Sequence, residues 1–312
     1  MEYRNLGKSG LQVSVLGLGT NNFGMRSDRD TSIAVVNRAL DSGITFIDTS
    51  DSYGGQGRSE EYIGEALKGR RQEAVLATKF SSPMGEGPYM SGGSRRYVMR
   101  AVEASLRRLQ TDYIDLYQFH WPDPRTPIEE TLRALDDLVR RGDVRYIGCS
   151  NFAAWQVVEA AWTARTEHLT PFISAQNLYN LTDRGVEREL LPACRACGLG
   201  FIPYFPLASG LLTGKYRRGE PPPEGARLSA GPMASRFLSD RNFDLVERLE
   251  SVASASGHTV GELAVAWLAA QPAIGSVIVG VRSPEQLDAH LQAVEWKMTP
   301  EELQAIDEAS RG

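Results

Sequence analysis

The sequence contains little that would direct the protein to a membrane, an oxidising compartment or a polyanion. Its 312 residues include three cysteines, an odd and low number that implies no disulfide framework. The first segment, residues 1–14, is polar and lacks the apolar core of a secretory signal peptide. No apolar run approaches the roughly 18 residues that span a bilayer. The formal net charge of −5 disfavours nucleic acid or an anionic membrane as a partner. These absences predict a cytoplasmic protein.

Metal-binding patterns are also scarce. The chain has four histidines, and its one cysteine pair at close spacing is Cys194 and Cys197, a C-x-x-C late in a helical pattern. No second pair completes a zinc site, and the sequence context of a redox motif is missing. We therefore predict two ordinary helix residues here and no metal site.

What the sequence does contain is a repeated alternation of short apolar runs and longer amphipathic segments. The apolar runs have the length expected of strands that are buried on both faces. Helical patterns between them have apolar residues along one face. Strands separated by helical crossovers form parallel sheets, and eight strands is the number at which such a sheet closes. We predict a (β/α)8 barrel in one domain, residues 1–312. The eight runs are 15–20, 45–50, 74–80, 114–120, 146–151, 172–179, 200–206 and 276–281.

Further elements accompany the barrel pattern. A β-hairpin is expected over residues 3–13, and two extra helices are expected near 284–294 and 299–309. Long connections at 81–94 and 217–232 leave the carboxyl ends of strands, the face on which barrel enzymes carry their sites. A doubly wound open sheet is the alternative, but the chain lacks the G-x-G-x-x-G turn that such a sheet normally places after a strand.

Polar side chains at the ends of three successive predicted strands indicate a chemical site. Asp48 ends the second strand, Lys79 lies near the end of the third, and His120 ends the fourth, while Tyr53 follows Asp48 closely. Each residue alone has a structural explanation, as a turn residue, a lysine reaching solvent, a core histidine or a packing tyrosine. Because the strand ends share one rim of a barrel, we expect the four to act together.

This set suits the protonation of an oxygen while hydride reaches the adjacent carbon. A phenol with an ordinary pKa of about 10 is a poor acid, and a nearby ammonium lowers that pKa by stabilising the phenolate. A carboxylate would hold the ammonium in place, and an imidazole can orient a carbonyl or share in proton transfer. No side chain supplies hydride, so a nicotinamide cofactor is implied.

Several segments resemble the aldo-keto reductases, in the order GLGTNNFG, FIDTSDSYGG, LATKF, DYIDLYQFHWPD, GDVRYIGCSNF and IVGVRSPEQL. The resemblance covers nearly the whole chain. It implies that Asp48, Tyr53, Lys79 and His120 form the catalytic tetrad of a reversible, NADPH-dependent reduction of aldehydes or ketones. Because it extends to potassium-channel β subunits, the alternative is a cofactor-binding, redox-sensing subunit with little turnover. A third hypothesis makes Lys79 the Schiff-base nucleophile of an aldolase barrel.

The resemblance also implies a nicotinamide site, and this site argues against the aldolase. Ser150, Asn151 and Gln176 would hold the carboxamide, and Tyr204 would stack on the ring, although from the residues alone Tyr204 is equally a buried aromatic at the rim. The remaining positions near the reactive half and the pyrophosphate are Gly19, Thr20, Asn21, Asp48, Leu207, Ala208, Ser209 and Lys215.

After the last predicted strand come Gly280, Arg282, Ser283 and Gln286, where barrels commonly bind phosphate. Because arginine contacts phosphate oxygens through two donors at once, we expect NADPH to be preferred over NADH. The family often has Glu and Asn next, for the adenine. This chain has Ala289 and His290, so altered adenine recognition is expected.

Aromatic residues at strand ends are expected to form an apolar cleft around the carbonyl of a small-molecule substrate. The chain ends soon after its last predicted helix, so we expect no C-terminal tail over this cleft, in a monomer or weak homo-oligomer. The expected cleft residues are Phe23, Phe80, Trp121, Phe152 and Tyr179.

Overall fold

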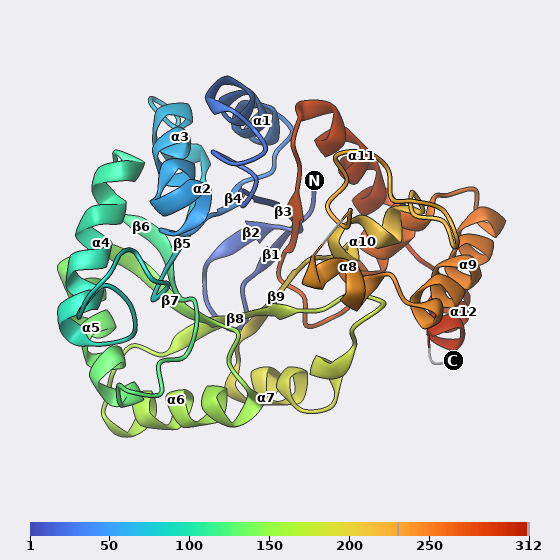
Figure 1. The fold of residues 1–312 in the computed structure, drawn as a ribbon. Helices are drawn as coiled ribbons and strands as arrows, with labels where there is room; N and C mark the ends of the chain where they lie inside the picture. Colours follow the sequence, from blue (N-terminus) through green and yellow to red (C-terminus); the bar gives the residue numbers. More distant parts are fainter. Residues whose placement is uncertain (230, 311–312) are drawn as a thin grey trace.

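In the computed structural model, which describes residues 1–229 and 231–310, eight parallel strands stand inside a ring of helices (Figure 1). Their order is β10-β3-β4-β5-β6-β7-β8-β9. A parallel bridge joins Phe201 of the edge strand β9 to Ile274, three residues before the other edge strand β10, so the sheet is nearly closed. The predicted (β/α)8 barrel is confirmed. The strands are β3 (Leu16–Gly19), β4 (Phe46–Asp48), β5 (Val75–Phe80), β6 (Ile114–Phe119), β7 (Val144–Ser150), β8 (Phe172–Leu178), β9 (Gly200–Tyr204) and β10 (Val277–Gly280).

The predicted hairpin is also present, formed by β1 (Tyr3–Asn5) and β2 (Gln12–Ser14). Leu6 and Val13 from this hairpin segment pack in a separate apolar cluster with strand residues such as Phe46. The turn passes so close to β9 that a Cβ on Gly7 would lie 2.4 Å from the backbone nitrogen of Gly200. Because Gly7 also has a positive φ of 61°, only glycine fits this position without strain.

Helices cover the outside of the barrel (Figure 1). Helices α4 (Arg95–Leu109) and α5 (Ile128–Arg141), for example, each bury one apolar face and expose the opposite polar face. The two extra helices predicted near the C-terminus are α11 and α12. Within the described residues, no helix is both long and apolar enough to cross a membrane. The helices are α1 (Arg29–Asp41), α2 (Tyr53–Gln56), α3 (Arg58–Ala66), α4 (Arg95–Leu109), α5 (Ile128–Arg141), α6 (Ala154–Thr166), α7 (Leu190–Cys197), α8 (Pro232–Phe237), α9 (Asp240–Ala255), α10 (Val260–Ala270), α11 (Pro284–Glu295) and α12 (Pro300–Ser310).

The cysteines behave as ordinary interior residues. Cys194 is buried, Cys197 is half-buried on α7, and both thiols are free. Nowhere among the described residues do three or more histidine, cysteine or carboxylate side chains gather as a metal site would require.

Candidate functional site

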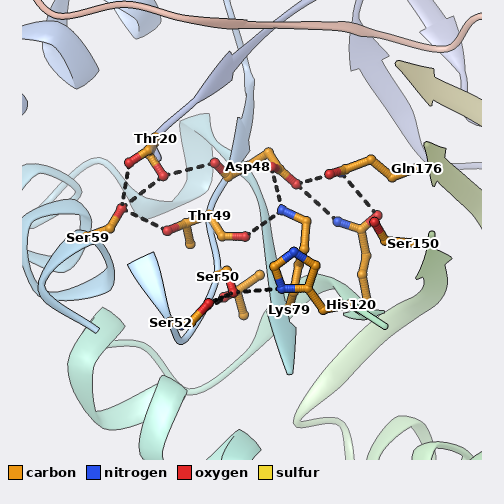
Figure 2. A network of polar contacts seen from close by, with 12 residues as sticks. Thr20, Asp48, Thr49, Ser50, Ser52, Ser59, Lys79, His120, Ser150 and Gln176 are labelled. Atoms are coloured by element: carbon orange, nitrogen blue, oxygen red, sulfur yellow. Dashed lines mark hydrogen bonds and ion pairs between the residues drawn. The ribbon is translucent and has the colours of Figure 1, made fainter. Parts of the chain in front are cut away.

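A buried ion pair lies where β4 and β5 end (Figure 2). The Lys79 Nζ atom lies 2.6 Å from Asp48 Oδ2 and donates a second hydrogen bond to the Thr49 carbonyl at 2.8 Å. Asp48 Oδ1 accepts hydrogen bonds from the side-chain amides of Gln176, at 2.8 Å, and Gln118, at 3.1 Å. Both charged groups therefore have a counterion and further hydrogen-bond partners, as buried charges need to have.

Tyr53 lies next to this pair, with its ring centroid 5.1 Å from Lys79 Nζ. The backbone makes a tight turn immediately after it. A Cβ on Gly54 would lie 2.7 Å from the Phe23 carbonyl oxygen, and Gly54 has a φ of 72°. A glycine at this position therefore lets the chain turn while it presents Tyr53 to the site.

The electrostatics of Tyr53 differ from the expectation in one respect. Desolvation by burial raises its pKa, and Lys79 opposes that effect without overcoming it, so the net direction is upward. For Lys79 itself, burial alone would lower the pKa, but Asp48 and Tyr53 together raise it above its ordinary value. Without a bound ligand, the site therefore holds a neutral phenol beside a firmly protonated lysine.

His120 faces Tyr53 edge-on, with the ring centroids 6.0 Å apart. Burial, assisted by the charge of Lys79, lowers the pKa of His120 to about 3. The imidazole is therefore neutral at ordinary pH, so one of its ring nitrogens donates a hydrogen bond and the other accepts one.

The residues expected around the nicotinamide are linked to one another. Asn151 Nδ2 donates to the Ser150 hydroxyl at 3.1 Å and to the His120 carbonyl at 3.0 Å, and Asn151 Oδ1 accepts from the Tyr204 hydroxyl at 2.8 Å. Asn151 also has a positive φ of 61°, which asparagine tolerates better than most residues. The structure thus brings Ser150, Asn151, Gln176 and Tyr204 to one wall.

A cavity of about 650 Å³ opens above this wall. Most of the expected site residues line it, whereas Lys79 lies buried behind it. The expected residues on its surface are Gly19, Thr20, Asn21, Asp48, Tyr53, His120, Trp121, Ser150, Asn151, Gln176, Tyr204, Leu207, Ser209, Lys215, Gly280, Arg282 and Gln286, together with the two noted adenine positions, Ala289 and His290.

The segment after β9 is conformationally strained. Phe205, Ala208 and Ser209 all have positive φ values, 55°, 47° and 58°, which are unusual for residues other than glycine. Such strain tends to collect where a ligand is held. The Ser209 hydroxyl oxygen is buried at the cavity and has no hydrogen-bond partner among the described residues, so a polar ligand group could satisfy it.

Four cationic side chains line the cavity close enough to one another to interact: Arg26, Lys215, Arg227 and Arg282. Burial lowers the pKa of Lys215, and its three cationic neighbours lower it further. Burial and Arg26 likewise lower the pKa of Arg227. Like charges brought together in this way favour an anionic ligand.

Four expected cleft residues do not reach the cavity. Phe80 is fully buried between Tyr117 and Phe119, with centroid distances of 4.8 and 5.0 Å, so the prediction that it lines the cleft is wrong. Phe23, Phe152 and Tyr179 are also core residues. Of the five, Trp121 lies at the cavity and is 52% exposed.

Two expected cofactor contacts also lie off the cavity surface. Ala208 is fully buried within the strained segment, and Ser283 is the N-cap residue of α11. The position of Ala208 in this segment is consistent with a backbone role, since its φ of 47° shapes the segment.

The cavity is also lined by Arg26, Phe205 and Arg227, which no sequence pattern predicted. Arg227 lies in the long connection 217–232, and its guanidinium packs over the Phe205 ring at 5.2 Å. The long connection leaves the face of the barrel that carries active sites, which suggested that it contributes to the site. It contains several arginines, however, and the sequence does not show which of them lines the cavity.

Comparison with known proteins agrees with this geometry. The aldo/keto reductase family model matches residues 15–311. The chain belongs to the aldo/keto reductase family.

The proteins to which this chain is similar have names that indicate different functions. An oxidoreductase of Bacillus subtilis, YrpG, is 39% identical, with 100% of this chain and 97% of that protein covered. A rice protein named "Probable voltage-gated potassium channel subunit beta" is 37% identical, covering 98% of this chain and 96% of its own. The L-glyceraldehyde 3-phosphate reductase of Escherichia coli K12 is 34% identical, with 99% and 92% covered. A protein named as a reductase and one named as a probable channel subunit are therefore similar to this chain to nearly the same degree.

Proposed function

We propose that this aldo/keto reductase is an NADPH-dependent carbonyl reductase that converts aldehydes or ketones to alcohols reversibly, with Tyr53 as the proton donor. The observation that carries the proposal is the contact of Tyr53 with the buried Lys79–Asp48 pair, at a cavity that His120 also lines. The same arrangement makes an aldolase role for Lys79 a poor fit, because the lysine is held protonated and a Schiff base needs a neutral amine.

Each group has a physical role in this proposal. Lys79 offsets part of the cost of forming a phenolate at Tyr53, and Asp48 keeps Lys79 charged and in position. His120, neutral at working pH, is placed to donate a hydrogen bond to a carbonyl oxygen. NADPH, when bound, supplies the hydride that no side chain can supply.

The cavity residues fit NADPH in two respects. The unpartnered Ser209 hydroxyl lies on the strained segment after β9, where we expect the pyrophosphate. The four cations supply charge for the pyrophosphate and for the additional 2′-phosphate of NADPH. We assign the 2′-phosphate to Arg282, which belongs to the segment after β10.

The substrate is proposed only as a small carbonyl compound. Trp121 is the exposed aromatic wall beside His120, with the two rings 5.7 Å apart. Because all three cysteines are free, we also propose a reducing cytoplasmic location. We further propose that the protein is a single-domain monomer or weak homo-oligomer.

The decisive experiment replaces Tyr53 with Phe. We expect NADPH consumption with a panel of aldehydes to fall by about 100-fold or more, the usual size of a general-acid contribution, while the Kd for NADPH changes little. Tyr62, which is partly buried on α3, supplies a matched Tyr→Phe control that should leave turnover intact. Full turnover in Tyr53→Phe would refute the assignment.

The channel-subunit relatives support a second candidate, a redox-sensing subunit that binds the cofactor with little turnover. The two functions are separable by one measurement. Stoichiometric binding of NADPH without steady oxidation by any aldehyde or ketone would favour the sensor, whereas multiple turnovers that depend on Tyr53 would favour the enzyme.

A further inference from the structure

A chain of polar atoms leads from the cavity into the protein interior through His120. The Nδ1 atom of His120 lies 3.2 Å from the Ser50 hydroxyl, and that hydroxyl lies 3.1 Å from Oδ1 of Asp51. Figure 2 shows the contact of His120 with Ser50, with the second ring nitrogen directed away from it. Asp51 is therefore two hydrogen bonds from a residue that lines the cavity.

Asp51 is a buried carboxyl group that has no assigned role in the proposed reaction. It is 1% exposed, and its nearest strong charges are Glu60 and Arg108. Arg108 is already committed, because it pairs with Glu60 at 2.7 Å, and Glu60 accepts a further hydrogen bond from Thr78 at 2.6 Å. No ion pair is formed by Asp51 within the described residues.

The other groups that face Asp51 do not supply a counterion either. The Tyr97 hydroxyl on α4 lies 3.5 Å from Oδ2 but closer, at 3.2 Å, to the Ser82 carbonyl oxygen, which is its better acceptor. Burial and the neighbouring Glu60 raise the pKa of Asp51 to about 7. The carboxyl group thus changes its charge in the range where most enzymes work. The remaining titratable groups whose charges couple to it are Tyr53 and Tyr117.

A neutral imidazole has one ring proton, and the tautomer decides whether the nitrogen facing a substrate donates or accepts. When Asp51 is protonated, it can donate to Ser50 and Ser50 can donate to Nδ1, which leaves the proton on Nε2. When Asp51 is ionised, Ser50 donates to Asp51 and its oxygen accepts from Nδ1, so the ring proton moves to Nδ1. The proton lost overall leaves from Nε2 to solvent through the cavity.

We propose that Asp51 is a positioning residue that sets the tautomer of His120 through Ser50. The inference rests on the proposed function for its consequence, since a proton on Nε2 lets His120 donate to the carbonyl oxygen during reduction. The reverse tautomer offers that oxygen a lone pair. Reduction is therefore favoured when Asp51 is protonated, and its kcat falls about tenfold as Asp51 ionises.

The direct test is ¹⁵N NMR of the free protein labelled at histidine rings, which distinguishes the two tautomers. The chain has four histidines, and the signals of His120 are those missing from His120→Asn. We expect the protonated nitrogen to change from Nε2 to Nδ1 between well below and well above neutral pH. In Asp51→Asn, whose amide can always donate to Ser50, we expect the Nε2 tautomer throughout.

Two further variants separate this role from a general structural effect. Ser50→Ala breaks the chain and should make the tautomer independent of pH. Ser82→Ala removes the other hydroxyl near Nδ1, at 3.2 Å, and should keep the pH-dependent change. A parent protein with one tautomer at both pH values, or an Asp51→Asn protein that still changes, would overturn the proposal. Because the NMR measurement needs no turnover, loss of the proposed activity would be recognised separately.

Discussion

The ammonium of Lys79 lies 2.6 Å from the carboxylate of Asp48, and the two side chains are 0% and 4% exposed. A buried pair of this kind is strongly coupled, because removal of one charge leaves the other without compensation in a medium that solvates it poorly. The pair therefore provides a test of both stability and function.

We predict that Asp48→Asn lowers the free energy of unfolding by about 3–5 kcal/mol, because Lys79 loses its counterion. Activity should be lost as well. The double variant Asp48→Asn/Lys79→Met should recover part of the stability but none of the activity, since it removes the buried charge together with the catalytic group. Urea denaturation followed by circular dichroism measures the free energy of unfolding of the parent and the variants. A single variant as stable as the parent would contradict the prediction.

Cofactor preference provides a second prediction, at Arg282. Arg282→Ala should raise the Kd for NADPH about tenfold, the effect of losing roughly one charged hydrogen bond, and should change the Kd for NADH little. Fluorescence titration with both cofactors measures the two constants. Lys297→Ala is the matched control, because it removes the same charge from an exposed ion pair with Glu2. Equal losses for the two cofactors would show that Arg282 does not read the 2′-phosphate.

The depressed pKa of His120 predicts how stability changes with pH. The unfolded chain has an ordinary histidine pKa near 6.5 and the folded chain one of about 3, so the unfolded state binds more protons between those values. Stability must therefore fall as pH decreases through this range, by about 2 kcal/mol between pH 7 and pH 5 from this group alone.

The measurement compares parent and His120→Asn by urea denaturation at both pH values. The variant should lose about 2 kcal/mol less than the parent over this interval. Asp51 acts in the opposite direction, since its raised pKa makes the folded state bind more protons throughout the interval, but it is present in both proteins. His168→Asn, at an exposed position, is the control and should behave like the parent. An identical pH dependence in His120→Asn would mean that His120 does not contribute.

Substitutions of Phe80 and Trp121 test which aromatic residue belongs to the core and which lines the cavity. Phe80→Ala should cost about 3–5 kcal/mol of stability, because it removes a fully buried ring, while KM values stay close to those of the parent. Trp121→Ala, at a half-exposed ring on the cavity, should change stability by less than about 1 kcal/mol and alter the order of KM values across a panel of aldehydes. A shift in substrate preference in Phe80→Ala without loss of stability would contradict the structure.

The sequence by itself determined the barrel and its polar strand ends. Eight short apolar runs could be buried only as strands of one sheet, and their carboxyl ends had to share a face. This placed Asp48, Lys79 and His120 together before any contact was known. The incorrect prediction that Phe80 lines the cleft could have been recognised from the sequence, because neighbouring residues on a strand face opposite sides. With Lys79 directed toward Asp48, Phe80 had to point outward.

Only the tertiary structure decided the rest. Arg26 and Arg227 come from connections that are distant in sequence, and their convergence on one cavity depends on how those connections fold back over the strand ends. The pKa of Tyr53 depends on a balance that composition does not contain, since Lys79 lowers it and desolvation raises it more. Likewise, Asp51 differs from other carboxylates in the chain because the fold buries it beside Glu60 and commits Arg108 elsewhere. Residue types supplied the chemical groups, and burial decided their protonation states.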